Sequence, residues 1–490
     1  MKNYKYIGLF LLSLGLVSCD VNNELDDIAA EVLPVVELNT NGLDFSSYVS
    51  IGASFTAGYS DGALFIAVQE NSFPNILAGK FGTDFTQPLM NDNIGGMVDG
   101  STVELAPRLY FNGAGPARLP ATPTTQSSDV ISGPFNNMGV PGAKSFHLGV
   151  PGYGTLNPYF GRMASSPAAT VLGDAIVQNP TFFTLSEIGG NDVLGYATSG
   201  GIGVDQTGNY DASSYGVNDI TDPTVFAQVF TGMVSALTAN DAKGVVSNVP
   251  YVTSLAYFTT VPYNPIPLDA GTATYVTSAY ATYNGGLQLA QSYNMIDAAE
   301  VAKRTINFVE GQNAVVIEDE DLTDLSALGI PSYRQSTTAD LIVLTASTFI
   351  GTLADPSNPA SINGVGVALA DKWVLTTTEQ AKIKKATDAY NTTIETIVAA
   401  NPNLALVDFK GILQEASAGI QFDEYVMNTS LVFGGLLSLD GVHLTSRGYA
   451  LLANKILAAM DAEFGSNFTK ATDGLAKAND YQTNYSPALR

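Results

Sequence analysis

The sequence predicts an α/β fold in which a parallel sheet lies between two layers of helices, a three-layer α/β/α sandwich with a long insertion. Short, nearly continuous apolar runs alternate with segments whose apolar residues recur at helical spacing. Continuous apolar runs are typical of parallel strands, because helices cover both faces of such a sheet. The alternation of the two patterns predicts the sandwich.

The predicted strands are short, and turn-forming or small residues end each of them. They are SYVSIG (47–52), TFFTLSEIGG (181–190), GVVSNVP (244–250) and LALVDF (404–409). The predicted helices have one apolar stripe each and cover 223–238, 376–398 and 446–462. Pro223 suits a first helical turn, and Thr376 with Glu379 has the spacing of a capping box.

The two ends of the chain differ in composition from its middle. Residues 1–18 carry an early positive charge and a short apolar run, which is the pattern of a secretory signal peptide. Residues 19–45 are expected to be an acidic tether, and residues 466–490 a polar C-terminal tail. The domain between them is expected to cover 46–465, and residues 252–372 within it are expected to form an insertion or lid subdomain.

The run Leu16-Val17-Ser18-Cys19 is similar to the lipobox of bacterial lipoproteins. That resemblance implies acylation of Cys19 and a lipid-anchored protein of the cell envelope, at the outer membrane of a Gram-negative bacterium. Acidic residues shortly after Cys19 resemble a surface-export signal, although an acidic linker that is merely soluble has the same composition.

Charge and residue counts exclude several classes of function. The chain of 490 residues has 46 acidic and 21 basic residues and a net charge of −25, so the body of the protein is not expected to bind nucleic acid or an anionic membrane surface. It contains one cysteine and two histidines, which predicts no disulfide and no zinc site. The acidic run at 318–324 lacks the spacing of a calcium-binding loop and is expected to be a solvated face.

Four separated segments place chemistry-bearing residues at strand ends or before a helix. Ser54 follows the first strand through small residues, and Asn191 follows the strand at 181–190. Asp440 and His443 are three residues apart before a predicted helix, where the carboxylate can orient the imidazole as a base for a serine. Gly142, in FNNMGVPGAKS, lets a backbone N–H approach a substrate oxygen. Each segment alone is also compatible with an ordinary turn.

Taken in order, these segments resemble the SGNH (GDSL) hydrolase family, whose fold is flavodoxin-like. The resemblance implies Ser54 as nucleophile, His443 as base and Asp440 as its orienter. It also implies an oxyanion hole made by the N–H groups of Ser54 and Gly142 with the amide of Asn191. The chain departs from the family at Ala53, where the first motif usually has aspartate, so the hydrogen bonding of that loop is expected to differ.

The function expected from this resemblance is that of a lipid-anchored, lipase-like serine esterase that cleaves carboxylic esters through an acyl-enzyme, without cofactor or metal. The substrate would be a fatty-acyl ester or an acetyl ester of a glycan. The insertion, with Tyr257, Phe258 and Tyr263, is expected to cover the acyl group. His147 is expected to be structural. The alternative is a non-catalytic binding lipoprotein of the same fold that partners an outer-membrane transporter.

Overall fold

Five parallel strands form the central sheet of the protein. The computed structural model describes residues 34–490, and its compact unit spans Leu38–Arg490. The strands lie in the order β15-β8-β7-β1-β6, and every neighbouring pair is parallel. They are β1 (Tyr48–Gly52), β6 (Asn137–Gly139), β7 (Phe182–Leu185), β8 (Lys243–Ser247) and β15 (Leu404–Val407). The predicted α/β class with a parallel sheet is confirmed.

The order of the strands creates a crevice at the carboxyl end of β1. From β1 the chain moves to β6 on one side of it, and then returns to place β7, β8 and β15 on the other side. Loops that leave neighbouring strands in opposite directions open a crevice at this point, and open α/β sheets bind their ligands there. Ser54 follows β1 and Asn191 follows β7, so the topology brings both residues to this crevice.

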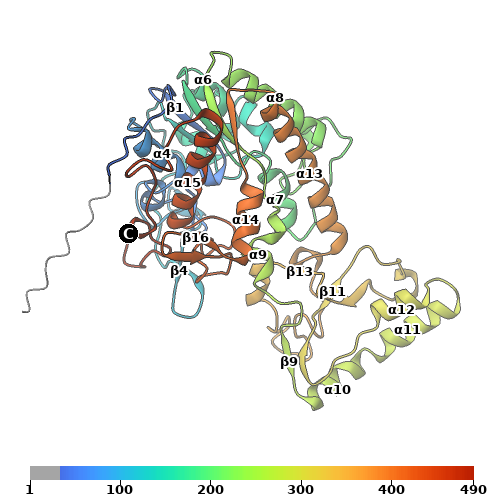
Figure 1. The fold of residues 1–490 in the computed structure, drawn as a ribbon. Coiled ribbons are helices and arrows are strands. Elements are labelled where there is room, and N and C mark those ends of the chain that lie inside the picture. The colour runs from blue at the N-terminus through green and yellow to red at the C-terminus, as the bar shows by residue number, and fades with distance from the viewer. Residues whose placement is uncertain (1–33) are drawn as a thin grey trace, which may run out of the picture. The chain divides into compact units, whose positions relative to one another are not determined.

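Helices pack against the sheet in two groups. α4 (Phe73–Phe81) and α15 (Ser446–Phe464) pack together, and α15 also contacts β15 and β8. The other group contains α6 (Val171–Ile176), α8 (Pro223–Leu237) and α13 (Thr377–Ala399), and α13 contacts the same two strands. Figure 1 shows the sheet between α15 and α4 on one side and α8 and α13 on the other. The three predicted helices are confirmed, including the capping box of Thr376 and Glu379.

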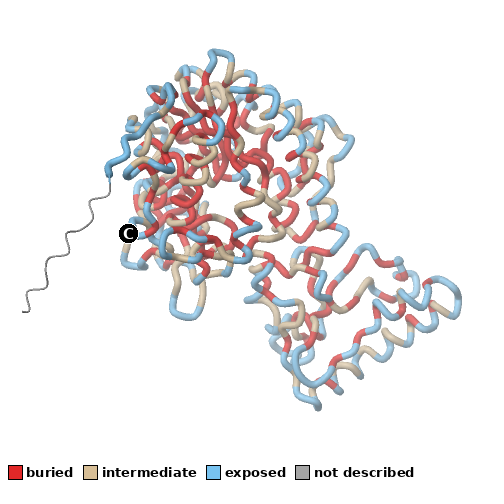
Figure 2. Tube along the Cα trace, in the orientation of Figure 1, coloured by how far each residue is buried: buried red, intermediate tan, exposed pale blue. Residues whose placement is uncertain are grey.

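The core lies on both faces of this sheet. All residues of β1 and β7 are buried, including Tyr48, Phe182 and Phe183. Figure 2 shows buried backbone concentrated around the strands, with exposed backbone in the outer loops and helix faces. Burial on both faces explains why these strands are continuous apolar runs and do not alternate with polar residues.

One strand of the sheet was not expected from the sequence. Residues 135–145 have the composition of a glycine- and proline-rich loop, yet Asn137–Gly139 form β6 beside β1. The strand is only three residues long, and it ends at Gly139, where a Cβ would lie 2.3 Å from the backbone nitrogen of Ala57. This close approach requires Gly139, and the same glycine makes the segment resemble a loop in the sequence.

Both predicted domain boundaries lie too far inside the chain. At the N-terminal boundary, Leu43 and Phe45 are buried, and Phe45 stacks on Phe81 with 3.9 Å between ring centroids. At the C-terminal boundary, Phe468 and Tyr485 are buried in the same core. Residues from about 39 to 45 and from 466 onward therefore belong to the folded unit, because their aromatic side chains complete its core. The predicted signal peptide 1–18 and Cys19 lie outside the described residues.

The insertion at 252–372 has its own small elements and a small separate core. Leu287, Ile296, Leu325 and neighbouring apolar residues form that core, and Arg304 is buried beside it. Its elements, which run from light green through yellow to light orange in Figure 1, are α9 (Ala256–Thr259), β9 (Ile266–Leu268), α10 (Ala270–Ala279), α11 (Ala281–Ser292), α12 (Ala298–Arg304), β10 (Gly311–Asn313), β11 (Val316–Glu318), β12 (Tyr333–Gln335) and β13 (Leu341–Ile342), which pairs with β14 (Val374–Leu375).

The remaining α-helices and strands are short. They are α2 (Ser54–Ala57), α3 (Ile66–Gln69), β2 (Met97–Asp99), β3 (Thr102–Leu105), β4 (Leu109–Phe111), β5 (Pro116–Arg118), α5 (Pro158–Met163), α7 (Asn191–Thr198), α14 (Phe409–Ala418), β16 (Ile420–Phe422) and β17 (Tyr425–Met427). Among residues 34–490, no helix combines the length and the apolar character needed to cross a membrane.

Candidate active site

The turn after β1 holds Ser54 at the start of α2. Gly52 allows this turn, because a Cβ there would lie 2.1 Å from the hydroxyl oxygen of Thr56 and 2.7 Å from the carbonyl oxygen of Ser186. No side chain fits that space. The Ser54 side chain faces the crevice and is mostly shielded, with 8% of the residue exposed.

A buried carboxylate organises the same turn. Oε1 of Glu187 accepts hydrogen bonds from the backbone N–H groups of Ala53, at 2.6 Å, and Thr56, at 3.1 Å. Glu187 follows β7 and has a left-handed φ of 54°, which is uncommon for a residue with a side chain. Burial raises the pKa of Glu187 to about 8, against the lowering effect of these backbone donors. The turn therefore depends on a carboxylate that comes from the neighbouring strand.

A second loop, before α15, brings a base to Ser54. Nε2 of His443 lies 2.9 Å from Oγ of Ser54, and Nδ1 of the same ring lies 2.9 Å from Oδ2 of Asp440. Because an ionised carboxylate only accepts hydrogen bonds, Nδ1 carries the proton in the neutral ring. Nε2 then presents a lone pair to the Ser54 hydroxyl, which is the arrangement that a general base for a serine requires.

The charge of Asp440 is strongly stabilised. Its Oδ1 accepts the backbone N–H groups of Val442 and His443, each at 2.8 Å, and its Oδ2 accepts that of Gly62 at 2.8 Å. Although burial alone would raise the pKa of Asp440, the His443 ring and these donors lower it well below its usual range. The carboxylate therefore stays ionised opposite the imidazole.

The loop that carries Asp440 and His443 is fixed from two sides. The His443 ring lies between the rings of Tyr59 and Phe55, with centroid distances of 4.5 and 5.7 Å. Asp61 is buried, and its Oδ1 accepts the N–H of Leu439 at 3.0 Å. Burial and the nearby charge of Asp440 raise the pKa of Asp61 to about 7, although the Leu439 N–H acts in the opposite direction.

Asn191 and Gly142 come together at the carboxyl ends of β7 and β6. The Asn191 amide donates one N–H to the carbonyl oxygen of Ala143, at 2.9 Å, and keeps a second N–H for another acceptor. Asp192, which is fully buried, accepts both the N–H and the hydroxyl of Ser145. These bonds tie the loop after β6, including Gly142 with its left-handed φ of 78°, to the start of α7.

A pocket opens beside Ser54 and continues into an apolar one. The first is lined by Ser54, Asn191, Glu187 and apolar residues that include Leu194 and Val442. Gly142 is not among the described residues that line it. Both pockets share Phe55, Pro250, Leu255 and Phe409, and the second extends between Leu413, Leu437, Leu444 and Leu451. Its wall comes from α14, α15 and the segment before α15.

No family model, curated protein or solved structure matches this chain. Its function is therefore inferred from the geometry of the site.

The insertion contributes less to the pockets than the sequence suggested. Only its first residues, Val252 and Leu255, reach the lining. Phe258 is buried elsewhere in the core, and neither Tyr257 nor Tyr263 lines either pocket. Phe258 and Tyr257 instead belong to the packing of the main core.

The two histidines differ in their surroundings. His147 accepts the backbone N–H of Lys144 through Nδ1, at 3.1 Å, and stacks on Tyr153 at 4.6 Å. Burial, and the charge of Lys144, lower the pKa of His147 to about 4. It is neutral near pH 7 and serves a structural contact, as expected from the sequence.

Three carboxylates of the site escaped sequence reasoning, namely Glu187, Asp61 and Asp192. Asp192 stood next to Asn191 in a predicted motif, and Asp61 preceded a glycine, which is an ordinary signal for a turn. Glu187 lay inside an apolar run, and an acidic residue at the end of a buried strand was the one available signal.

Proposed function

We propose that the protein is a serine esterase of the SGNH type that cleaves carboxylic esters through an acyl-enzyme on Ser54. The observation that carries the proposal is the hydrogen-bonded chain from Ser54 through His443 to Asp440, at 2.9 Å for each step. Its position at the switch point of a parallel sheet supports a role in ligand chemistry. A purely structural role for a serine, a histidine and a buried ionised aspartate in this order would not require an adjacent pocket.

The proposed reaction has two steps. Oγ of Ser54 attacks the ester carbonyl while Nε2 of His443 takes its proton, and the carbonyl π electrons move to the oxygen. The free N–H of Asn191, with the backbone N–H groups of Ser54 and Gly142, would stabilise this oxyanion. Collapse breaks the C–O bond to the alcohol, which receives the proton from His443. Water, activated by the same ring, then hydrolyses the acyl-enzyme.

The apolar pocket indicates an acyl group longer than acetyl. It begins at Phe55, next to the nucleophile, and continues between Leu413 and Leu451. Each buried methylene contributes about 0.8 kcal/mol to the free energy of binding, so a lining without charged side chains favours an aliphatic chain. An acetyl group would leave the inner pocket empty, and a glycan would find few polar partners in it. We therefore favour a fatty-acyl ester over an acetylated glycan.

The lipid anchor at Cys19 and location at the outer membrane remain part of this proposal. They rest on the lipobox-like run Leu16-Val17-Ser18-Cys19 alone. An anchored esterase would meet ester lipids or their fragments close to the membrane. A non-catalytic partner of an outer-membrane transporter would not need the ionised Asp440 opposite His443.

A fluorophosphonate probe tests the nucleophile directly. We expect one covalent label on the wild type and none on Ser54→Ala, with loss of aryl-ester turnover in the same variant. Ser60→Ala is the matched control, because Ser60 is also buried at 1% exposed and lies six residues away. Equal labelling of Ser54→Ala and wild type would reject the assignment.

A further inference from the structure

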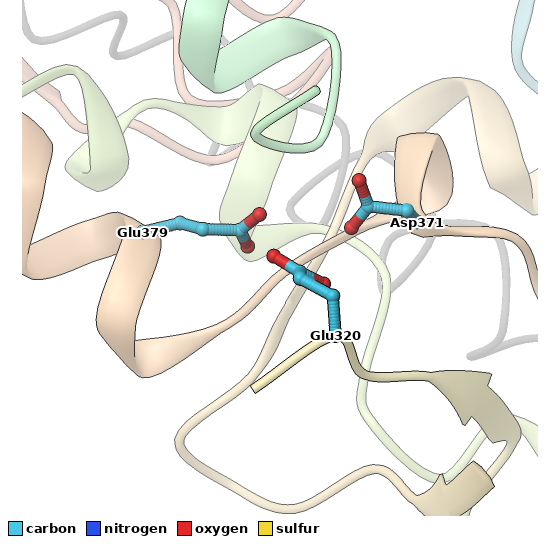
Figure 3. A group of neighbouring side chains, drawn as sticks. All are labelled: Glu320, Asp371 and Glu379. Carbon is cyan, nitrogen blue, oxygen red and sulfur yellow. The ribbon is translucent and has the colours of Figure 1, made fainter. Parts of the chain in front are cut away.

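Three carboxylates meet outside the candidate active site, where the insertion joins the main sheet domain. Figure 3 shows Glu320, Asp371 and Glu379 pointing toward one another. One oxygen from each lies within 4.8 Å of the others. Glu320 follows β11 in the insertion, Asp371 lies at the end of the insertion, and Glu379 lies in the first turn of α13.

Two oxygens of this cluster are buried without a partner. Glu379 is fully buried; its Oε2 accepts both the N–H and the hydroxyl of Thr376, while Oε1 has no hydrogen-bond partner. Oδ1 of Asp371 is likewise buried and unpaired. A buried carboxylate oxygen without a donor is costly, so each such atom requires an explanation.

No basic side chain pairs directly with the cluster in the described part of the chain, although Lys382 lies nearby, 3.4 Å from the hydroxyl of Tyr196. Among residues 34–490, no lysine or arginine forms an ion pair with Glu320, Asp371 or Glu379. Like charges this close together repel one another, and a cation bound between the three carboxylates would offset that repulsion.

The backbone is shaped around these carboxylates. Gly201, just after α7, has a left-handed φ of 86°, and a Cβ on it would lie 1.8 Å from Oε1 of Glu379. A Cβ on Gly200 would lie 2.4 Å from the carbonyl oxygen of Asp371. Gly201 thus leaves room for the carboxylate of Glu379, and Gly200 for the backbone of Asp371.

We propose that Glu320, Asp371 and Glu379 bind one Ca²⁺ ion, which ties the insertion to α13 of the sheet domain. All donors are oxygen atoms, which suits a hard cation. Oxygens on opposite sides of Ca²⁺ are about 4.6–5.2 Å apart, and those around Mg²⁺ only about 4.0–4.2 Å apart. The three oxygens lie within 4.8 Å of one another, so all of them can reach one ion of the size of Ca²⁺. A calcium ion here was not expected from the sequence, which predicts a solvated face at 318–324 and no metal; five of these seven residues are exposed.

Titration of the metal-free, full-length chain with CaCl₂ tests the proposal. Isothermal calorimetry should give one Ca²⁺ per chain, and the melting temperature should rise steadily with Ca²⁺ concentration, because the ion binds the folded state. Mg²⁺ at the same concentrations should bind at least tenfold more weakly. Absence of saturable Ca²⁺ binding, or tighter binding of Mg²⁺, would overturn the assignment.

Variants of the two ligands that are not fully buried separate binding from folding. Glu320→Gln removes the charge of an exposed ligand, and Asp371→Asn removes that of a half-buried one. Each should weaken Ca²⁺ binding tenfold or more while the circular dichroism spectrum without calcium stays unchanged. Asp321→Asn is the matched control, since it removes the same charge from the next exposed residue of the same loop. Unchanged affinity in both ligand variants, or an equal loss in Asp321→Asn, would place the ion elsewhere.

Discussion

The carboxylate of Glu187 accepts the backbone N–H of Ala53 at 2.6 Å, across the gap between the turns that follow β7 and β1. The sequence lacks the aspartate that the SGNH resemblance leads one to expect at position 53. The structure supplies a buried carboxylate to this turn from another strand, which accounts for how a turn with alanine can still be held for Ser54.

Glu187 should make stability depend on pH. Its folded pKa, raised to about 8 from an ordinary 4.5, means that the folded state penalises the charged form. Its contribution is fully present below pH 4.5 and is lost as pH rises through 8. Between pH 5 and pH 9 the loss should be on the order of 4 kcal/mol. Urea unfolding of the wild type and Glu187→Gln should show the wild type losing stability relative to the variant over this range. A pH-independent difference would contradict the assignment.

His443 and His147 should respond differently to substitution. His443→Ala removes the base, and kcat for an aryl ester should fall by about 10²–10⁴-fold or more. His147→Ala should leave kcat largely intact and lower the melting temperature, because the lost contacts with Lys144 and Tyr153 are structural. Steady-state kinetics and thermal unfolding of both variants check this, and the opposite ranking would identify His147 as the base.

Asn191 should act on the transition state. Asn191→Ala removes an N–H that is free to meet the oxyanion, so kcat should fall by about 10²–10³-fold with little change in KM. The substitution also removes the hydrogen bond to the carbonyl oxygen of Ala143. The loop that carries Ala143 is still held by the two hydrogen bonds from Ser145 to Asp192. A change confined to KM would mean that Asn191 contacts the substrate only in the ground state.

The inner apolar pocket should set the preference for acyl length. Ile412→Trp, at its wall, should reduce kcat/KM for long-chain esters on the order of tenfold while short-chain esters are spared, because filling the pocket removes apolar contact area. Tyr263→Ala in the insertion is the control and should leave the ratio of long- to short-chain kcat/KM unchanged. If Tyr263→Ala shifts the ratio and Ile412→Trp does not, the insertion governs specificity.

Gly52 should tolerate no side chain. In Gly52→Ala the new Cβ would meet Thr56 and the backbone of Ser186, which should destabilise the fold by about 1–3 kcal/mol and displace Ser54. Gly79→Ala, at an exposed position of α4 where a Cβ meets nothing within 4 Å, should stabilise by about 0.5–1 kcal/mol. Chemical denaturation and ester turnover measure both effects. A Gly52→Ala variant of wild-type stability and activity would refute the steric argument.

Sequence patterns predicted the parts of this protein that are governed by local rules. Strands β1, β7, β8 and β15 are apolar runs because the sheet is buried on both faces, and α13 begins with a recognisable capping box. Strand β6 could not be predicted, because three residues that include a glycine show no periodic pattern of apolar residues.

The site was predictable only where its residues stood in ordered motifs. The structure brings Ser54, His443 and Asp440 together as those motifs suggest. The contact of Glu187 with the turn at Ala53, the pocket wall at Leu413 and the closeness of Glu320 to Glu379 all depend on contacts between distant segments. No local pattern encodes such contacts, so they appear only in the folded chain.

The nucleophile and its base are 389 positions apart in the chain. During synthesis, Ser54 therefore emerges long before His443, and the hydroxyl stays unactivated until α15 and the loop before it have docked. A partly made or truncated chain would carry the serine without a base. For the proposed esterase, ester turnover would therefore report on completed folding of the whole domain, because a chain that ends before His443 carries Ser54 alone.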